Sequence, residues 1–204
     1  RKKEPPFFDL DLWVGQGLAM IEKLAGTEPC AFAGHSLGGA LALKIASRAP
    51  NVRHVLTSSS IGTGYPLNQY LNGFWDLPSD KDNLRNVMGN MVFDPASISE
   101  EMLDGRWNLL IQEGYGDYFV QMFAGNRQDF IDTAIVTDEE AGAITASVTM
   151  IHGRNDKPCP AEQTTLVLSE QLSQADVILI GNCGHNLPRE QTDKYVAAAV
   201  SLLG

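Results

Sequence analysis

Hydrophobic residues recur along the chain in two patterns, which predict helices that alternate with short strands. Residues 10–25 carry apolar side chains at steps of three and four, as in an amphipathic helix. A short apolar run at 30–33 predicts a buried strand, residues 37–48 a helix, and residues 52–57 a second strand. This order of helix, strand, helix and strand is typical of a parallel sheet with helices on both faces.

The pattern changes after Ser60. Residues 83–135 predict several helices separated by turns, and they contain no sustained strand alternation. The sequence Ser97-x-x-Glu100 predicts a capping box that opens one of these helices. We expect further helix breaks at three glycines, Gly114, Gly116 and Gly125. The whole stretch therefore indicates an inserted helical cap.

The first pattern resumes in the last third of the chain. It predicts two more strands and two more helices, over residues 147–152, 177–180, 161–173 and 190–203 respectively. The expected fold class is α/β, a mostly parallel sheet interrupted by a helical cap. We expect the core and the cap to occupy residues 1–61, 62–143 and 144–204, the middle range being the cap.

Composition and charge exclude several classes of protein and partner. Hydrophobic residues make up 44% of the 204, enough to bury a core and too many for a disordered chain. The formal net charge is −10 and the one basic cluster is Arg1-Lys2-Lys3, so we expect neither nucleic acid nor an anionic membrane as a partner.

The hydrophobic runs and cysteines bear on location. No apolar run is long enough to span a membrane, and no signal-peptide pattern is present. Three widely spaced cysteines form no disulfide framework and fit a reducing, cytoplasmic location.

Gly34-His35-Ser36-Leu37-Gly38 is a G-x-S-x-G sequence between a predicted strand and a predicted helix. In that context a sharp turn presents the serine hydroxyl at the C-terminal edge of the sheet, and the Leu37 N–H at the helix start can donate to an oxyanion. The alternative is a glycine-rich turn with a serine helix cap, and the flanking strand and helix make it the weaker interpretation.

A serine nucleophile needs a base, and the base needs an acid to orient it. Asp156 and His185 follow the strands predicted at 147–152 and 177–180, so they should lie at the same sheet edge as Ser36. His35, His54 and His152 are the rival bases; we assign the first to shaping the pocket and the others to structural roles. The alternative for Asp156 is that it only caps a turn.

A metal site is the main alternative use of the cysteines and histidines. Cys159, Cys183, His152 and His185 could bind zinc, but the chain lacks the paired Cys-x2-Cys spacing that such sites favour. We therefore expect no metal and no organic cofactor.

These motifs, with Gly153-Arg154-Asn155-Asp156 and Cys183-Gly184-His185, resemble the α/β-hydrolase superfamily over essentially the whole chain. Residues 93–107, which end in Gly105-Arg106-Trp107, look like the cap helix of meta-cleavage product hydrolases. That resemblance implies hydrolysis of a carbon–carbon bond in 2-hydroxy-6-oxo-2,4-dienoates, formed when aromatic compounds are degraded. It also implies that Arg106 binds near the dienoate head and that His35 lines the pocket. Trp107 is a second candidate for substrate contact, and the alternative is that it is a core aromatic.

The predicted helix gives Arg106 a physical reason for this role. Ile98, Met102, Arg106 and Leu110 recur at steps of four, which places a cation in an apolar stripe. A guanidinium in such a place needs an anion. That anion is a substrate carboxylate, or in the alternative an internal partner such as Asp94 or Glu113.

The chain departs from the resembled family at two pocket positions and at its start. It has His35 where the family commonly has asparagine, and Asn186 where the family commonly has tryptophan. The family also has about four strands before the first helix seen here, and the loop among them supplies the second oxyanion donor. We therefore expect the N-terminal strands of the usual sheet to be missing, as in the C-terminal two-thirds of such an enzyme or, in the alternative, in a naturally short relative. We also expect a partner segment or chain, such as a second copy, to cover the edge strand.

The function predicted from the sequence is that of a serine hydrolase acting on a small molecule with a carbonyl group. The first expectation is carbon–carbon hydrolysis of a dienoate, a substrate that also carries a carboxylate. The second is a carboxylesterase for small esters. The third, from another class, is an inactive or merely ligand-binding relative.

Overall fold

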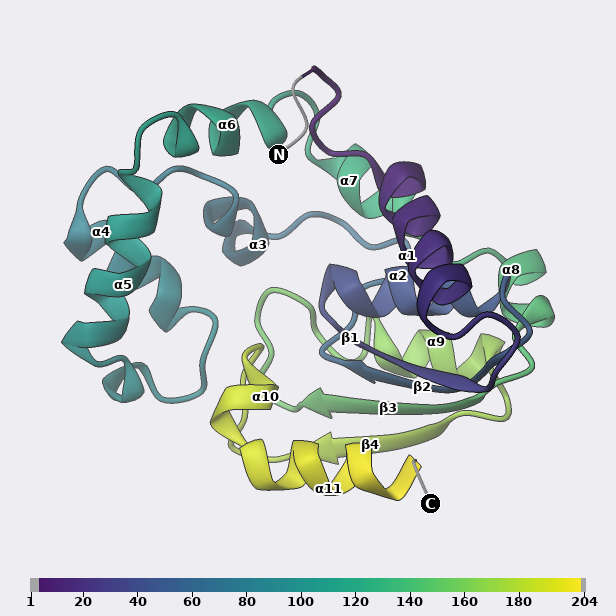
Figure 1. The fold of residues 1–204 in the computed structure, drawn as a ribbon. Coiled ribbons are helices and arrows are strands. Elements are labelled where there is room, and N and C mark those ends of the chain that lie inside the picture. The colour runs from purple at the N-terminus through teal and green to yellow at the C-terminus, as the bar shows by residue number, and fades with distance from the viewer. Residues whose placement is uncertain (1–3, 203–204) are drawn as a thin grey trace.

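The computed structural model describes residues 4–202 and is built around a parallel sheet (Figure 1). Its four strands lie in the order β1-β2-β3-β4 and run over Cys30–His35, Val52–Ser58, Ser147–Gly153 and Asp176–Ile180. All four predicted strands are therefore confirmed to within two residues at each end. Because every strand is parallel, their C-terminal ends meet at one edge, the usual place for a site in this architecture.

Helices cover both faces of the sheet. Figure 1 shows α1, α2 and α9 on one face and α11 on the other. The core helices are α1 (Leu10–Leu24), α2 (Leu37–Ala46), α8 (Asp138–Ala143), α9 (Thr165–Gln171), α10 (Leu187–Glu190) and α11 (Thr192–Leu202). Buried aliphatic residues fill both interfaces, and Leu43 of α2 is fully buried with Val55 and Met150 of the sheet in the cluster that also includes α1. None of the described helices has the length and apolar character needed to cross a bilayer.

The middle of the chain forms a helical group beyond the strand ends, and Figure 1 shows the arrowheads of β3 and β4 pointing to that side. It comprises α3 (Gln69–Phe74), α4 (Lys81–Gly89), a 3-10 turn η1 (Pro95–Ser97), α5 (Glu100–Leu110), α6 (Tyr115–Met122) and α7 (Gln128–Thr133). The inserted helical segment predicted after Ser60 is present. Its exact division from the core at residues 62 and 143 stays a prediction.

Two local predictions in this segment were wrong. The capping residue of α5 is Ser99, whose hydroxyl accepts from Met102 N, rather than Ser97. Ser97 lies in η1, and its hydroxyl donates to the Asp94 carbonyl at 2.7 Å. Pro95 favours this separate turn because its fixed φ suits the first position of a helical turn.

Gly116 lies inside α6 rather than breaking a helix. Gly114, two residues earlier, takes the left-handed conformation at the N-cap of α6. One glycine is therefore enough to separate α5 from α6. Gly125, with φ 99°, lies between α6 and α7 as expected of a break.

The two edges of the described sheet are β1 and β4. On β1 the side chains of Ala31 and Ala33 are exposed. An open edge of this kind can pair with another strand. That further strands or a second copy cover β1 stays a prediction.

A buried ion pair fastens α8 to α2. Lys44 Nζ donates to Glu140 Oε2 at 2.7 Å and to the Ile135 carbonyl at 2.6 Å, and the Lys44 side chain is only 9% exposed. Arg48 also contacts Glu140, at 3.3 Å, but its side chain is 45% exposed. The buried Lys44 ammonium therefore relies on Glu140 as its counter-ion, whereas the Arg48 guanidinium is largely solvated.

We expect Glu140→Ala to lower the free energy of unfolding by about 2–4 kcal/mol, because it leaves the Lys44 ammonium buried without its counter-ion. Arg48→Ala removes the exposed partner and should cost no more than about 0.5 kcal/mol. Urea titrations followed by circular dichroism measure both. Equal losses in the two variants would contradict the assignment.

Candidate active site

Ser36 lies on a sharp turn between β1 and α2. Its backbone has φ 57° and ψ −122°, a conformation that non-glycine residues rarely adopt. Any side chain at Gly34 would collide with the Gly38 carbonyl, so the turn requires glycine at that position. The strained turn and the close packing beneath it hold the Ser36 hydroxyl at the C-terminal edge of the sheet.

The structure brings the three residues predicted as a triad into one hydrogen-bonded chain. The Ser36 hydroxyl donates to His185 Nε2 at 2.9 Å, and His185 Nδ1–H donates to Asp156 Oδ2 at 2.8 Å. Ser36 follows β1, Asp156 follows β3 and His185 follows β4, so the parallel strand ends bring together Ser36 and His185, which lie 149 positions apart. Their catalytic roles stay a prediction, which is developed as a proposal below.

Asp156 is buried and satisfied by several donors. The backbone N–H of Cys159 donates to Oδ1 at 2.8 Å, and His152 Nε2 lies 3.1 Å from Oδ2. His152 Nε2 also faces the Cys159 carbonyl at 2.8 Å, which can only accept, so the proton of the neutral ring belongs on Nε2. The ring's other nitrogen, Nδ1, contacts the Thr165 hydroxyl at 2.7 Å. His152 is thus a buried structural histidine, but one that contacts the acid.

The interaction between Asp156 and His185 favours the ionised form of Asp156. Burial alone would raise the pKa of Asp156, but the charge of His185 and hydrogen bonds from His152 and His185 outweigh it and lower that pKa to about 2. Burial likewise opposes the charged form of His185, while Cys159 and the Asp156 carboxylate beside it favour that form. The net effect raises the pKa of His185 above its ordinary value.

The environment of His35 shifts its pKa in the direction opposite to that of His185. Its Nδ1 lies 3.1 Å from the Ser58 carbonyl oxygen, which can only accept, so Nδ1 carries the proton of the neutral ring. Burial and the nearby His185, whose ring centroid is 4.9 Å away, lower the pKa of His35 to about 4. His35 is therefore a neutral ring whose Nε2 has a free lone pair and no partner among the described residues.

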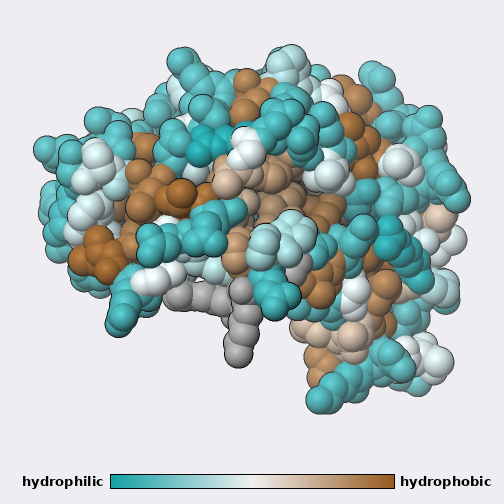
Figure 2. Space-filling model, turned by 90° about the horizontal axis from the view of Figure 1, so that it is seen from above, coloured by the Kyte–Doolittle hydropathy of each residue, from teal (hydrophilic) through white to brown (hydrophobic). Residues whose placement is uncertain are grey.

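A mainly apolar cavity of about 210 Å³ opens above Ser36. Its walls are Phe8, Leu37, Ile61, Leu71, Phe74, Trp75, Met91 and Phe123, and the polar groups are His35, Ser36 and His185. Residues 61–75 are rich in aromatic side chains, and this sequence signal could have identified part of the wall. Figure 2 shows hydrophobic side chains gathered in the middle of the face seen from above, inside a rim of polar ones.

The cap residues predicted to bind substrate lie away from this cavity. Arg106 lines a separate small cavity of about 20 Å³, which shares the Phe74 side chain with the larger one. Neither Asp94 nor Glu113 pairs with Arg106, and no other described residue forms an ion pair with it. Trp107 packs with Leu84, Leu103 and Leu110 inside the cap.

The structure also shows where the other predicted residues lie, namely Leu37, His54 and the candidate metal ligands. Leu37 is the first residue of α2, so its N–H has no intrahelical acceptor, and the residue lines the cavity above Ser36. His54 lies within β2, away from the cavity lining. Asp156, Cys159 and His185 offer ligand atoms within 4.8 Å of one another, and Cys183 is outside that group. Because the Asp156 and His185 atoms of this group already belong to the relay, the arrangement suits proton transfer better than a zinc site.

The family model described as "Alpha/beta hydrolase family" matches residues 3–199. Among curated proteins, the chain is similar to 2-hydroxy-6-oxo-2,4-heptadienoate hydrolase of Pseudomonas putida, with 27% identity over 93% of the chain and 68% of the relative. It is also similar to 2-hydroxymuconate semialdehyde hydrolase of a Pseudomonas species, with 28% identity over 93% of the chain and 67% of that protein.

Solved structures show the same relationship. The meta-cleavage product hydrolase CumD of Pseudomonas fluorescens superimposes with a TM-score of 0.91 at 27% identity, over 100% of this chain and 74% of that one. The match includes the sheet, the helices on its faces and the cap. Because the family model covers nearly the entire chain, we conclude that the chain belongs to the alpha/beta hydrolase family.

Proposed function

We propose that this protein is a serine hydrolase that cleaves the carbon–carbon bond of 2-hydroxy-6-oxo-2,4-dienoates. The observation that carries the proposal is the relay from Ser36 through His185 to Asp156, with hydrogen bonds of 2.9 and 2.8 Å. The substrate class is supported by the names of the relatives, which are hydrolases of such dienoates and of 2-hydroxymuconate semialdehyde.

In the proposed mechanism His185 is the base and Ser36 the nucleophile. His185 Nε2 takes the hydroxyl proton while Ser36 Oγ attacks the 6-oxo carbonyl, or activates a water molecule for that attack. Asp156 holds the tautomer of His185 and stabilises the imidazolium. The Leu37 N–H donates to the oxyanion that forms on the carbonyl oxygen.

The carbon–carbon bond can break only if the departing carbon can carry an electron pair. The dienol therefore first tautomerises to a ketone, so that the carbanion released is delocalised into the second carbonyl. The His185 imidazolium returns a proton to the leaving fragment, which departs as a 2-hydroxydienoate. Water, deprotonated by His185, then releases the carboxylic acid from Ser36.

His35 suits the hydroxyl of such a substrate. Its neutral Nε2 has a lone pair, so it can accept a hydrogen bond from a 2-hydroxyl group at the cavity floor. A neutral acceptor has no attraction for a carboxylate. The anionic end of the substrate therefore needs a different residue.

Arg106 is our candidate for that residue. It is a cation without an ion-pair partner among the described residues, and only the Phe74 side chain is common to its small cavity and the cavity above Ser36. A rotation of Phe74 would join the two spaces, and the Arg106 guanidinium could then bind a carboxylate.

A second candidate function is that of a carboxylesterase for small esters. The observation that favours it is the separation of Arg106 from the cavity above Ser36, whose walls are mostly apolar. A neutral ester could fill that cavity without reaching the cap cation, and the same relay would cleave it.

Replacing Ser36 with alanine should abolish covalent labelling by a fluorophosphonate probe and lower kcat by about 10⁴-fold or more, because the nucleophile is lost. Labelling is measured by intact-protein mass spectrometry. Ser169→Ala on α9, whose hydroxyl contacts only a local carbonyl, is the control and should label as the natural protein does. A folded natural protein that takes no label would favour the non-catalytic interpretation.

The pH dependence of kcat/KM should reveal the influence of Asp156 on His185. His185 accepts a proton only when neutral, and its pKa is raised, so kcat/KM should increase with pH through an acid limb above pH 6.5. Asp156→Asn removes the carboxylate that favours the charged ring. The limb should therefore move to lower pH, while kcat falls by about 10⁴-fold. Asp193→Asn on the surface of α11 should change neither, and an unmoved limb in the Asp156 variant would contradict the assignment.

Arg106→Ala should separate the two candidate substrates. It should lower kcat/KM for a dienoate by about 10- to 100-fold, the effect of one charge-assisted hydrogen bond, and leave a p-nitrophenyl ester nearly unaffected. Lys81→Ala removes another cap cation, one already paired with Asp104, and is the matched control. Equal losses with both substrates would argue against the dienoate.

A further inference from the structure

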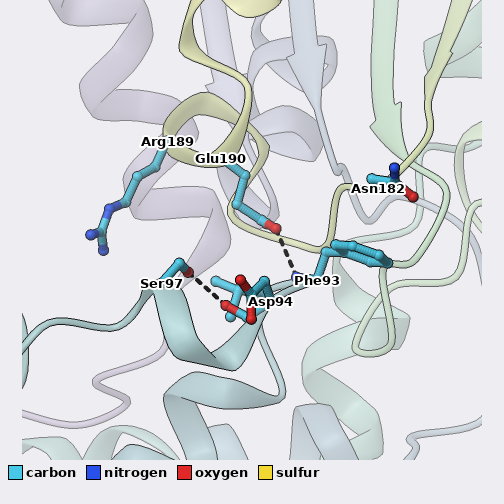
Figure 3. Close-up of a pocket in the computed structure, with 7 residues that line it drawn as sticks. Phe93, Asp94, Ser97, Asn182, Arg189 and Glu190 are labelled. Carbon is cyan, nitrogen blue, oxygen red and sulfur yellow. Dashed lines mark hydrogen bonds between the residues drawn. The ribbon is translucent and has the colours of Figure 1, made fainter.

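The loop that carries His185 is tied by a carboxylate to the cap segment between α4 and η1. Glu190, the last residue of α10, accepts from Phe93 N through Oε2 at 2.7 Å. The same carboxylate accepts from Gly184 N, with both oxygens at 3.1 Å. Figure 3 shows the Glu190 side chain pointing toward Phe93, whereas Arg189 on the same turn extends away. Two backbone segments 91 residues apart therefore share one acceptor group.

Backbone hydrogen bonds complete this junction. The N–H groups of His185 and Asn186 donate to the Met91 carbonyl at 2.8 and 3.0 Å. The two segments approach so closely that a Cβ at Gly184 would collide with the backbone of Val92 and Phe93. We call the loop that carries the base His185 the base loop. Residues 91–93 are hydrogen-bonded to His185 and Asn186 of this loop directly, and to Gly184 through Glu190.

A carboxylate is well suited to this place. Glu190 offers two oxygens with several lone pairs, and bonds from N–H groups to a charged oxygen are stronger than bonds to a neutral one. Gly184 immediately precedes His185, so fixing the Gly184 N–H fixes the peptide from which the imidazole projects. Neither hydrogen bond reaches the substrate or the Ser36 hydroxyl.

We propose that Glu190 is a positioning residue, which holds His185 in line with Ser36 by joining the base loop to residues 91–93 of the cap. This inference rests on the roles proposed for Ser36 and His185. It does not depend on whether the substrate is a dienoate or an ester. Met91 also lines the cavity, so the junction connects the cavity wall with the backbone of the base.

Removal of the carboxylate should affect the chemical step more than binding. Glu190→Ala frees two N–H donors and relaxes the peptide before His185, and a displacement of about 1 Å can cost about 100-fold in rate. We expect kcat for a p-nitrophenyl ester, and the rate of fluorophosphonate labelling of Ser36, to fall 10- to 100-fold. KM should change less than threefold, because the aromatic walls are untouched.

The conservative variant gives the second readout. Oε2 lies within hydrogen-bond distance of both Phe93 N and Gly184 N, so a glutamine oxygen in that position can accept from both, while its amide nitrogen replaces the second acceptor of Gly184 N. Glu190→Gln should therefore restore kcat and the labelling rate to within about fivefold of the natural protein. Arg189→Ala, which alters the neighbouring side chain and no hydrogen bond of the junction, should stay within twofold.

Each outcome separates this inference from the proposed function. A natural protein that is folded but unlabelled overturns the serine hydrolase itself. A labelled natural protein with an unchanged Glu190→Ala rate overturns the positioning role. If Glu190→Ala does not fold, as seen by circular dichroism, the Glu190→Gln rates decide: a labelling loss as large as 100-fold in that folded variant also overturns it.

Discussion

Everything proposed for this protein depends on one buried carboxylate, that of Asp156. A carboxylate that is only 5% exposed would be neutralised by protonation if it had no donors. Here the Cys159 N–H binds one oxygen, and the rings of His152 and His185 lie against the other. Because the acid stays ionised, it can fix the tautomer of His185, and the tautomer in turn leaves Nε2 free to accept from Ser36.

The parallel sheet explains how these groups meet. Ser36 follows β1, Asp156 follows β3 and His185 follows β4, and a parallel sheet places all three C-terminal ends on one side. This is why the relay could be predicted from the sequence: it required only recognisable strands and the residue types that follow them. The Gly34–Gly38 turn added the strongest local signal, since its geometry depends on neighbouring residues alone.

The cap was harder to predict because no backbone hydrogen bonds between neighbouring segments fix the positions of its helices, as they do for the strands of the sheet. Arg106 was placed on a stripe that began at Ile98, but Ile98 lies outside α5, which starts at Glu100. Helical periodicity says which residues share a face, whereas packing against α4 and α6 decides where that face points. The aromatic wall was missed because it depends on contacts between distant segments. The Cys159 N–H and His152 ring that contact Asp156 are instead local, within four residues of it.

The cavity and the relay place opposite demands on the environment of His185. An apolar, aromatic wall strengthens each hydrogen bond at the reacting carbonyl, but it also disfavours the imidazolium that must form. Asp156 offsets that cost within the relay. The neutral state of His35, 4.9 Å from His185 between ring centroids, avoids adding a second positive charge beside it. A positively charged residue before the nucleophile would oppose the proton transfer to His185, and this constraint makes a neutral hydrogen-bonding group a suitable choice at that position.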